Sequence, residues 1–502
     1  MKKISKESKE KIKRFILIYF ISLIICLPFL APHKITDTYW NIGEGIEIYK
    51  YTPLKDGRIV HFLILSVMDF FNIKMEFYSI AVHYICIIIY AFSIYNVFSY
   101  IMQLLKNKIE QNKNSKILKV IILISSVLII LNPLTVENFA YIENLIMSLS
   151  ILIGTIAARI IHENKKGAYL KTLFLIILAG LCYQGNLNVW IGLCILYFAI
   201  DEKKTIKEWI RYLLKLGSIT ILVLASLVAI LNITNLIIGN EQSRLGICKQ
   251  DLKEILSLFY IFITRPITDV TFGYYPKMLI LISILITTLL VVNLEKNKPI
   301  NSLIKYYFLI IIIILACVCP AFLQNNISLS ARMINGVGAI IGISLIYLCY
   351  IISKKENQNI KATIIVLILS IITFCINLFD YYNIAYMNQV TMKEEEKYIT
   401  QINEVMIEYE KENDIVLKKA MIFKDSNYTK TYKNLPSNTF NSRAIFTTYS
   451  RIYCLNYYTG RDLEEELYSE EKYNKYYKDK DWNEFNKEQV KFEGDTVYIC
   501  IY

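Results

Sequence analysis

Long apolar runs, separated by short polar segments, fill the first 379 residues of the chain. Most of the runs are about 16 to 25 residues long, which is the length that an α-helix needs to cross a bilayer. A further apolar segment, residues 59–71, has only about 13 residues, so we interpret it as an interfacial or re-entrant helix. About eleven spans are expected, near residues 15–31, 77–101, 117–132, 139–161, 168–184, 187–200, 213–239, 278–293, 305–323, 334–352 and 362–379.

The pattern changes after residue 380. Residues 393–415 have the spacing of an amphipathic, charged helix. Three later segments alternate or cluster apolar residues as strands do, namely 415–425, 443–450 and 495–502. We therefore predict an all-α polytopic membrane domain over residues 1–379 and an α+β domain over residues 380–502.

Composition supports this division. The 502 residues are 55% hydrophobic, which is too apolar for a soluble protein of this length. The basic segment at the start of the chain precedes a long apolar run without a small-residue cleavage site, so we expect an uncleaved first span. Cys454 and Cys500 both fall in the C-terminal domain, where a disulfide and two buried thiols are equally compatible with the sequence.

The net charge is +12, and the distribution of the basic residues indicates the membrane topology. Lysines cluster in alternate short loops, as in residues 106–116 and 201–215, whereas the intervening loops are nearly free of them. By the positive-inside rule, the N-terminus is cytoplasmic and the C-terminal domain lies outside the plasma membrane. The basic residues therefore do not indicate a nucleic-acid partner; the expected environment is a lipid bilayer.

Unusual polar residues collect in the segments assigned to the outer face. Ionisable groups at the ends of spans are costly unless they face a cavity or water. A carboxylate there can take a proton from an attacking hydroxyl, and an arginine fork can hold a phosphate. The candidates are Asp37, Glu44, Asp56, Arg58, Glu137, Glu143, Tyr183, Gln184, Arg244 and Arg332. Neither the cysteines nor the four histidines have the spacing of a metal site, so no metal ligand set is predicted.

The layout resembles the GT-C superfamily of polytopic glycosyltransferases: a first span with a cytoplasmic N-terminus, an acidic outer loop with a half-length helix, many spans and an outer C-terminal domain. "TDTYW", followed by "DGR", resembles the bacterial type II glucosyltransferases, which include O-antigen glucosylating enzymes. "SLSAR", ending in Arg332, is similar to a later outer-loop arginine of that family. The family often has two adjacent acidic residues where this chain has Asp37-Thr38. That departure leaves a carboxylate pair, and any metal that it holds, an open question.

The resemblance implies transfer of a sugar, often glucose, from an undecaprenyl-phosphate donor to a cell-surface glycan outside the membrane. It implies that Asp37 acts as the base and that Arg58 and Arg332 contact the donor phosphate. The other candidates are expected to line the site.

Each assignment has a structural alternative. Asp37 can cap a helix, and Asp56-Gly57 is a natural turn pair. The arginines can extend to lipid headgroups. Glu44 and Glu47 fit a solvated helix face. Two alternative classes of function also remain. One is another glycan-handling membrane protein, such as a polymerase, ligase or acyltransferase, and the other is a transporter or flippase of lipid-linked sugars.

Overall fold

The structure is a computed structural model of the chain. It describes residues 6–201, 206–239, 276–295, 299–317, 331–354, 360–432 and 439–502, with the separate positions 253, 254, 257 and 435. The described residues are mainly helical, with a small sheet near the C-terminus, as expected for a helical membrane protein with an α+β segment at its end.

Two compact units make up the chain. The larger unit contains residues 1–30, 50–72 and 80–382, and the smaller unit contains residues 31–49, 73–79 and 383–502. The smaller unit thus includes most of the first acidic loop in addition to the C-terminal segment. The last boundary falls inside helix α16 (Ile360–Asn413).

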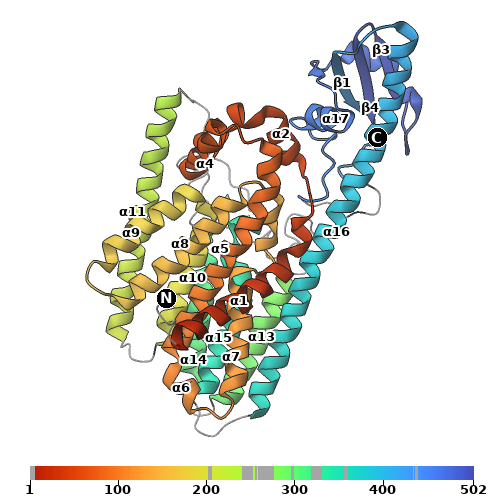
Figure 1. Cartoon of the computed structure of the whole chain (residues 1–502). Coiled ribbons are helices and arrows are strands. Elements are labelled where there is room, and N and C mark those ends of the chain that lie inside the picture. The colour runs from red at the N-terminus through yellow and green to blue at the C-terminus, as the bar shows by residue number, and fades with distance from the viewer. Residues whose placement is uncertain are drawn as a thin grey trace. The chain divides into compact units, whose positions relative to one another are not determined.

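The larger unit is a helical bundle (Figure 1). Its longer helices are α1 (Lys6–Cys26), α4 (Ile59–Phe70), α5 (Met75–Leu104), α7 (Ser115–Ile130), α8 (Asn144–Glu163), α9 (Ala168–Cys182), α10 (Leu187–Ile200), α11 (Ile206–Ile238), α13 (Pro276–Leu294), α14 (Pro299–Ala316), α15 (Asn335–Ser353) and the first part of α16. Short turns connect them: η1 (Leu27–Leu30), α3 (Tyr51–Lys55), α6 (Lys106–Gln111), η2 (Thr135–Ala140), η3 (Gln184–Asn186) and η6 (Ala331–Met333).

Seven helices within the described ranges are long and apolar enough to cross a membrane. They are the helices expected near 15–31, 77–101, 139–161, 213–239, 305–323, 334–352 and 362–379. The other four expected spans also form helices, namely α7, α9, α10 and α13. These four are not among the seven helices that are long and apolar enough to cross a membrane. The segment 59–71 forms α4, a helix of 12 residues. These helices fit a multi-pass membrane protein.

Helices α10 and α15 form the core of the larger unit. All 14 residues of α10 and all 19 residues of α15 are buried, because both helices are apolar on every side and other helices surround them. Helix α15 contacts α7, α13 and α14, whereas α10 contacts α8 and α14. The turns η3 and η6 precede α10 and α15, and η2 contacts η6, so the bundle determines the positions of these polar turns.

The smaller unit combines helices with a four-stranded sheet (Figure 1). Its elements are α2 (Thr36–Tyr49), the end of α16, β1 (Lys419–Lys424), α17 (Arg451–Thr459), β2 (Glu464–Glu465), α18 (Glu470–Tyr476), η7 (Lys487–Gln489), β3 (Val490–Glu493) and β4 (Thr496–Ile501). The strand order is β2-β1-β4-β3. Strand β1 is parallel to β2 and β4, and β3 and β4 form an antiparallel hairpin around Gly494, whose positive φ of 58° favours glycine.

A buried apolar cluster holds the smaller unit together. Ile399, Ile402 and Met406 come from one face of the end of α16, the part predicted as an amphipathic helix over 393–415. They pack against residues of β1, β4 and α17 and against Tyr39 of α2. The apolar face of a charged helix thus forms the core, and its charged face remains outside.

The predicted strand over residues 443–450 is wrong, because this segment forms consecutive turns. The backbone N–H of Ile445 donates to the buried carboxylate of Glu395 at 2.7 Å, in place of a strand partner. Thr447 N and Ser450 N close tight turns onto Ala444 O and Thr447 O. The sequence analysis also missed β2 and β3. Cys454 and Cys500 are buried free thiols and do not form a disulfide with each other.

Candidate functional site

Two arginines predicted from the sequence, Arg58 and Arg332, lie in one cluster of the larger unit. Arg58 precedes α4, and Arg332 is in η6. The guanidinium carbon of Arg58 lies 5.5 Å from the ring centre of Tyr183, and the guanidinium of Arg332 also interacts electrostatically with the hydroxyl of this tyrosine. The two charges are close enough to affect one another. The fold therefore brings together residues that are 274 positions apart in the sequence.

Arg58 is held by carboxylates but not saturated by them. Its Nη1 donates to Oε1 of Glu143 at 3.1 Å, and its Nη2 lies 3.8 Å from Oδ2 of Asp56. A guanidinium has five N–H donors. The contact with Glu143 is the one side-chain hydrogen bond that Arg58 makes within the described part of the chain, so donors remain for a ligand.

Arg332 is fixed at its backbone and along its side chain. Its backbone N–H donates to Oε2 of Glu137 at 2.7 Å, and its guanidinium carbon lies 3.8 Å from the ring centre of Tyr141. Nη1 lies 3.5 Å from Oε1 of Glu137. This buried nitrogen makes no hydrogen bond to any described residue. An unsatisfied buried N–H is costly, which favours an acceptor oxygen from a ligand at this position.

Both arginines stay charged. Burial lowers the pKa of Arg58, but Asp56 and Glu143 outweigh it, so the pKa is raised above its usual value. Burial likewise lowers the pKa of Arg332, and Tyr141, Tyr183 and Glu137 more than compensate. A guanidinium in this setting binds anions by charge and by its planar fork.

Buried amide side chains position the turn that carries Arg332. Asn188 donates to Met333 O at 2.6 Å and accepts from Gly336 N at 2.9 Å. Asn335, the first residue of α15, donates to Oδ1 of Asn186 at 2.8 Å, which connects α15 to η3. These residues are buried, so their hydrogen bonds link α10, α15 and η6 into one framework.

Gly185 permits the close approach of Tyr183 to η6. A Cβ at this position would lie 2.6 Å from the Tyr183 ring and 3.3 Å from Cα of Met333. Tyr183 is itself 4% exposed and has little room to move. A side chain at residue 185 would therefore displace either the tyrosine or the turn that carries Arg332.

The other predicted residues of the larger unit lie in or near these turns. Glu137 is in η2, Glu143 directly precedes α8, and Gln184 is a buried residue of η3. Asp56 follows α3. Arg244 lies outside the described residues, as do Glu241 and Arg265 of the neighbouring predicted outer segments.

The predicted base, Asp37, belongs to the smaller unit. It is the second residue of α2, inside the first turn, so it is not the N-cap residue. Its Oδ1 accepts a hydrogen bond from the hydroxyl of Tyr449 at 2.6 Å. Glu44, later in α2, accepts a hydrogen bond from the hydroxyl of Tyr453, whereas Glu47 is exposed.

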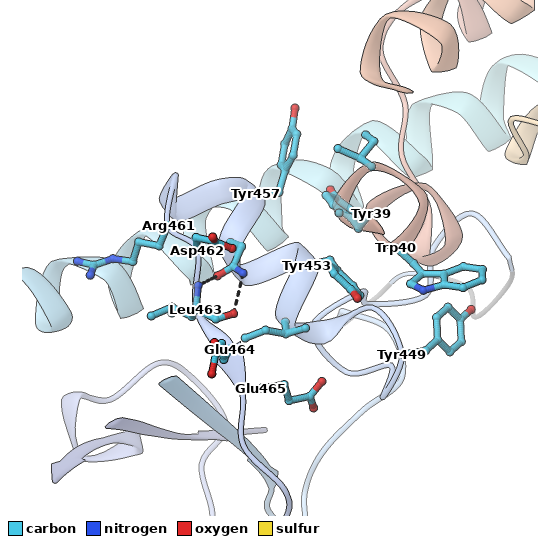
Figure 2. A pocket seen from close by; sticks show the side chains of 14 residues that line it. Tyr39, Trp40, Tyr449, Tyr453, Tyr457, Arg461, Asp462, Leu463, Glu464 and Glu465 are labelled. Carbon is cyan, nitrogen blue, oxygen red and sulfur yellow. Dashed lines mark hydrogen bonds between the residues drawn. The ribbon is translucent and has the colours of Figure 1, made fainter. Parts of the chain in front are cut away.

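A pocket of about 670 Å³ opens beside this helix (Figure 2). Helices α2 and α17 and the segment that follows α17 form its walls. Its lining is mainly aromatic and acidic: Tyr39, Trp40, Tyr449, Tyr453, Tyr457, Asp462, Glu464 and Glu465, with Ile42, Gly43, Ile452, Asn456, Arg461 and Leu463. Burial and then the hydrogen bond to Glu44 raise the pKa of Tyr453 to about 12, so its hydroxyl stays protonated at neutral pH.

Close packing at Gly43 joins the two helices of the pocket. A Cβ at Gly43 would lie 2.0 Å from Cδ1 of Tyr453, so the tyrosine ring lies directly on the backbone of α2. Only glycine allows this approach without a shift of α17.

The sequence analysis missed several of these residues. Asn186 and Asn335 stood out in the sequence as polar residues of the outer segments, but Tyr141 and Asn188 gave no signal, because a single aromatic or amide residue beside an apolar run has no distinctive spacing. The tyrosines of α17 lie in "RIYCLNYYT", and this density of aromatic residues next to acidic ones was a usable signal. No group of three or more histidine, cysteine, aspartate or glutamate residues that is suited to a metal occurs within the described ranges.

Comparisons with known proteins do not place the chain in a family: no family model, no curated protein and no solved structure matches it.

Proposed function

We propose that the protein is a membrane glycosyltransferase that transfers a sugar, with glucose as the first candidate, from a polyprenyl-phosphate donor to a glycan acceptor. The observation that carries the proposal is the paired placement of Arg58 and Arg332 around Tyr183, with guanidinium donors still available. A phosphate that is attached to a lipid needs a cationic site next to an apolar bundle, and these arginines provide one.

The chemistry requires a base and a cationic site for the leaving group. Asp37 takes the proton from the acceptor hydroxyl, and the acceptor oxygen forms a bond to the anomeric carbon. The bond between that carbon and the phosphate oxygen breaks, and its electron pair stays with the polyprenyl phosphate. The two arginines stabilise the charge that develops on this phosphate. The role of Asp37 rests on the sequence resemblance, whereas the phosphate site rests on the arginine cluster.

The test is sugar transfer by the purified full chain in lipid nanodiscs. Radiolabelled polyprenyl-phosphate glucose is the donor, and the envelope glycans of the producing cell are the acceptor. Arg332→Lys is expected to reduce transfer by at least about tenfold, because an ammonium group does not reproduce the planar fork.

Arg159→Lys is the matched control. Arg159 pairs with Glu163 near the other end of α8, about 24 Å along the helix from Glu143. We expect this variant to transfer at the wild-type rate. Wild-type transfer by Arg332→Ala would remove the arginine cluster from the mechanism and overturn the proposal.

A transport function is the second candidate, and one observation favours it. Asp380 in α16 is 2% exposed, and its Oδ2 has no hydrogen-bond partner among the described residues. Buried carboxylates of this kind mark proton and ion pathways in transporters. A transporter requires Asp380, so Asp380→Asn would stop the movement of a lipid-linked sugar across liposome membranes. The glycosyltransferase proposal predicts that Asp380→Asn still transfers sugar.

A further inference from the structure

The pocket of the smaller unit offers several aromatic faces at different angles. Trp40 and Tyr449 lie 6.0 Å apart, with their ring planes at 76° to each other. Tyr39 and Tyr457 lie 5.5 Å apart at 72°. Figure 2 shows Trp40 and Tyr449 beside one another. The rings of Trp40, Tyr449, Tyr453 and Tyr457 remain partly exposed, so a ligand has access to them.

The polar groups of the pocket are acceptors more than donors. Asp462 and Glu464 are exposed, and neither forms a hydrogen bond or an ion pair through its side chain within the described residues. The cation in the lining, Arg461, is already occupied. It donates to both carboxylate oxygens of Glu410, at 2.7 and 2.8 Å, and to Asn403 at 2.9 Å. Figure 2 shows its side chain pointing away from Trp40 and Tyr449.

This lining selects a particular class of ligand. Aromatic faces favour a ligand with flat apolar patches, and carboxylates favour one with many hydroxyl donors. Glu465 is paired with Arg451, and Arg461 is paired with Glu410. The carboxylates of Asp462 and Glu464 therefore dominate the pocket and repel anions, including phosphates and uronic acids. A volume of about 670 Å³ lies within the usual range of small-molecule sites, which is about 300–1,000 Å³. A short oligosaccharide without negative charge meets all of these conditions.

We propose that this pocket binds a neutral saccharide, with the rings of Trp40 and Tyr453 stacking on sugar faces and Asp462 and Glu464 accepting hydroxyl protons in hydrogen bonds. If the protein is the proposed glycosyltransferase, this saccharide is the acceptor glycan, and that assignment alone rests on the proposed function. Tyr449, which lines the pocket, donates to Asp37, so the proposed base lies beside the bound glycan.

The pocket is built before a ligand arrives. The side chain of Asn456 donates to Leu463 O at 2.9 Å and accepts from Leu463 N at 3.0 Å, as the dashed lines in Figure 2 mark. This pair of bonds fixes the segment that carries Asp462 and Glu464 against α17. The hydrogen bond between Tyr453 and Glu44 holds the opposite wall. Such preorganisation lowers the entropic cost of binding.

The test measures binding without any lipid donor. The full chain in nanodiscs is titrated with neutral trisaccharides of glucose, galactose, mannose and N-acetylglucosamine. Two charged trisaccharides are also tested: a glucosamine trimer, which is a triamine, and a galacturonate trimer. Tryptophan fluorescence and calorimetry report binding. At least one neutral trisaccharide is expected to bind, and to bind more tightly than the galacturonate trimer, because the pocket carboxylates repel anions.

Three variants localise the binding. Trp40→Ala is expected to weaken it by about tenfold, which corresponds to the loss of one stacked ring. Trp40→Phe retains an aromatic face and should bind almost as tightly as the wild type, which shows that the helix still folds. Trp482→Phe is the matched control, because Trp482 packs in a separate apolar cluster that does not line the pocket.

The outcomes separate this inference from the proposed function. Absence of binding by every neutral trisaccharide would overturn the inference, as would binding that Trp40→Ala leaves unchanged. If the triamine or the galacturonate trimer binds more tightly than every neutral trisaccharide, the proposal that the ligand is neutral is overturned. If saccharides bind but no sugar is transferred, the saccharide pocket is supported and the proposed glycosyltransferase function is not. If Trp40→Ala and the wild type transfer sugar at the same rate, the bound saccharide is not the acceptor glycan, but the proposed glycosyltransferase function is still supported.

Discussion

The hydroxyl of Tyr449 donates a hydrogen bond of 2.6 Å to Oδ1 of Asp37, although 412 positions separate the two residues in the sequence. The same aspartate oxygen accepts from the hydroxyl of Thr36 at 3.3 Å. The contact joins α2, in the first acidic loop, to the turns that precede α17. It places the carboxylate next to a ring that lines the aromatic pocket.

The first prediction concerns Asp37. Asp37→Asn keeps an oxygen that accepts from Tyr449, but the amide does not take a proton. We expect sugar transfer to fall by more than about 100-fold, which is typical for the loss of a general base. Tyr449→Phe removes the hydrogen bond and retains the carboxylate, so it should keep most of the activity. Transfer of radiolabelled sugar is measured for both variants at equal expression. Wild-type activity of Asp37→Asn would leave Glu44 or Asp56 as the next candidate for the base.

The second prediction concerns Gly185. Gly185→Ala places a methyl group 2.6 Å from the buried ring of Tyr183 and displaces Tyr183 or η6. Because small displacements at a reacting site are costly, we expect transfer to fall by about tenfold or more. Gly217→Ala is the control, since within the described residues only the backbone of its own helix surrounds its Cβ position and alanine favours the helix. Equal transfer by the two variants would show that the position of Arg332 relative to Tyr183 is unimportant.

The third prediction concerns orientation. The lysine-rich segment 106–116, which contains α6 and the start of α7, is expected in the cytoplasm and the C-terminus outside, by the positive-inside rule. Alkaline phosphatase, which needs disulfides and therefore an oxidising compartment, should be active when fused after Tyr502 and inactive when fused at Lys113. An active fusion at Lys113 would place the arginine cluster on the wrong side for an outer-face transferase.

The fourth prediction concerns pH. Hydrogen bonds from Lys472, Lys475 and Tyr476 lower the pKa of Glu493 in β3 well below its usual value of 4.5. A group whose pKa is lower in the folded state stabilises that state above the unfolded pKa and loses this contribution as the pH falls through the folded value. Amide exchange of the β3–β4 hairpin should therefore become faster relative to α17 on acidification below about pH 4.5, after correction for intrinsic exchange. Glu493→Gln should show much less of this dependence, and an identical pH profile in the two proteins would exclude the ion cluster as its cause.

Much of the candidate site was visible in the sequence as a set of residues. Glu137, Tyr183 and Arg332 stood out because charged or polar side chains at the ends of apolar spans need a protein partner. Their partners were not visible. The asparagine framework that holds η6 depends on contacts of η3 and α10 with η6 and α15, about 145 positions later in the chain, and local periodicity carries no information about such contacts.

The sequence by itself determined the helical membrane architecture, because the interior of a bilayer leaves no water for backbone groups and long apolar runs must form helices there. It also determined strands β1 and β4 and the amphipathic end of α16, where one face is apolar. Tertiary structure alone decided that residues 443–450 form turns, since the buried Glu395 takes the N–H of Ile445. It alone decided that Arg58 and Arg332 meet at Tyr183 and that α2 and α17 enclose an aromatic pocket. Both features are side-chain contacts between distant segments, and they exist only once the chain has packed.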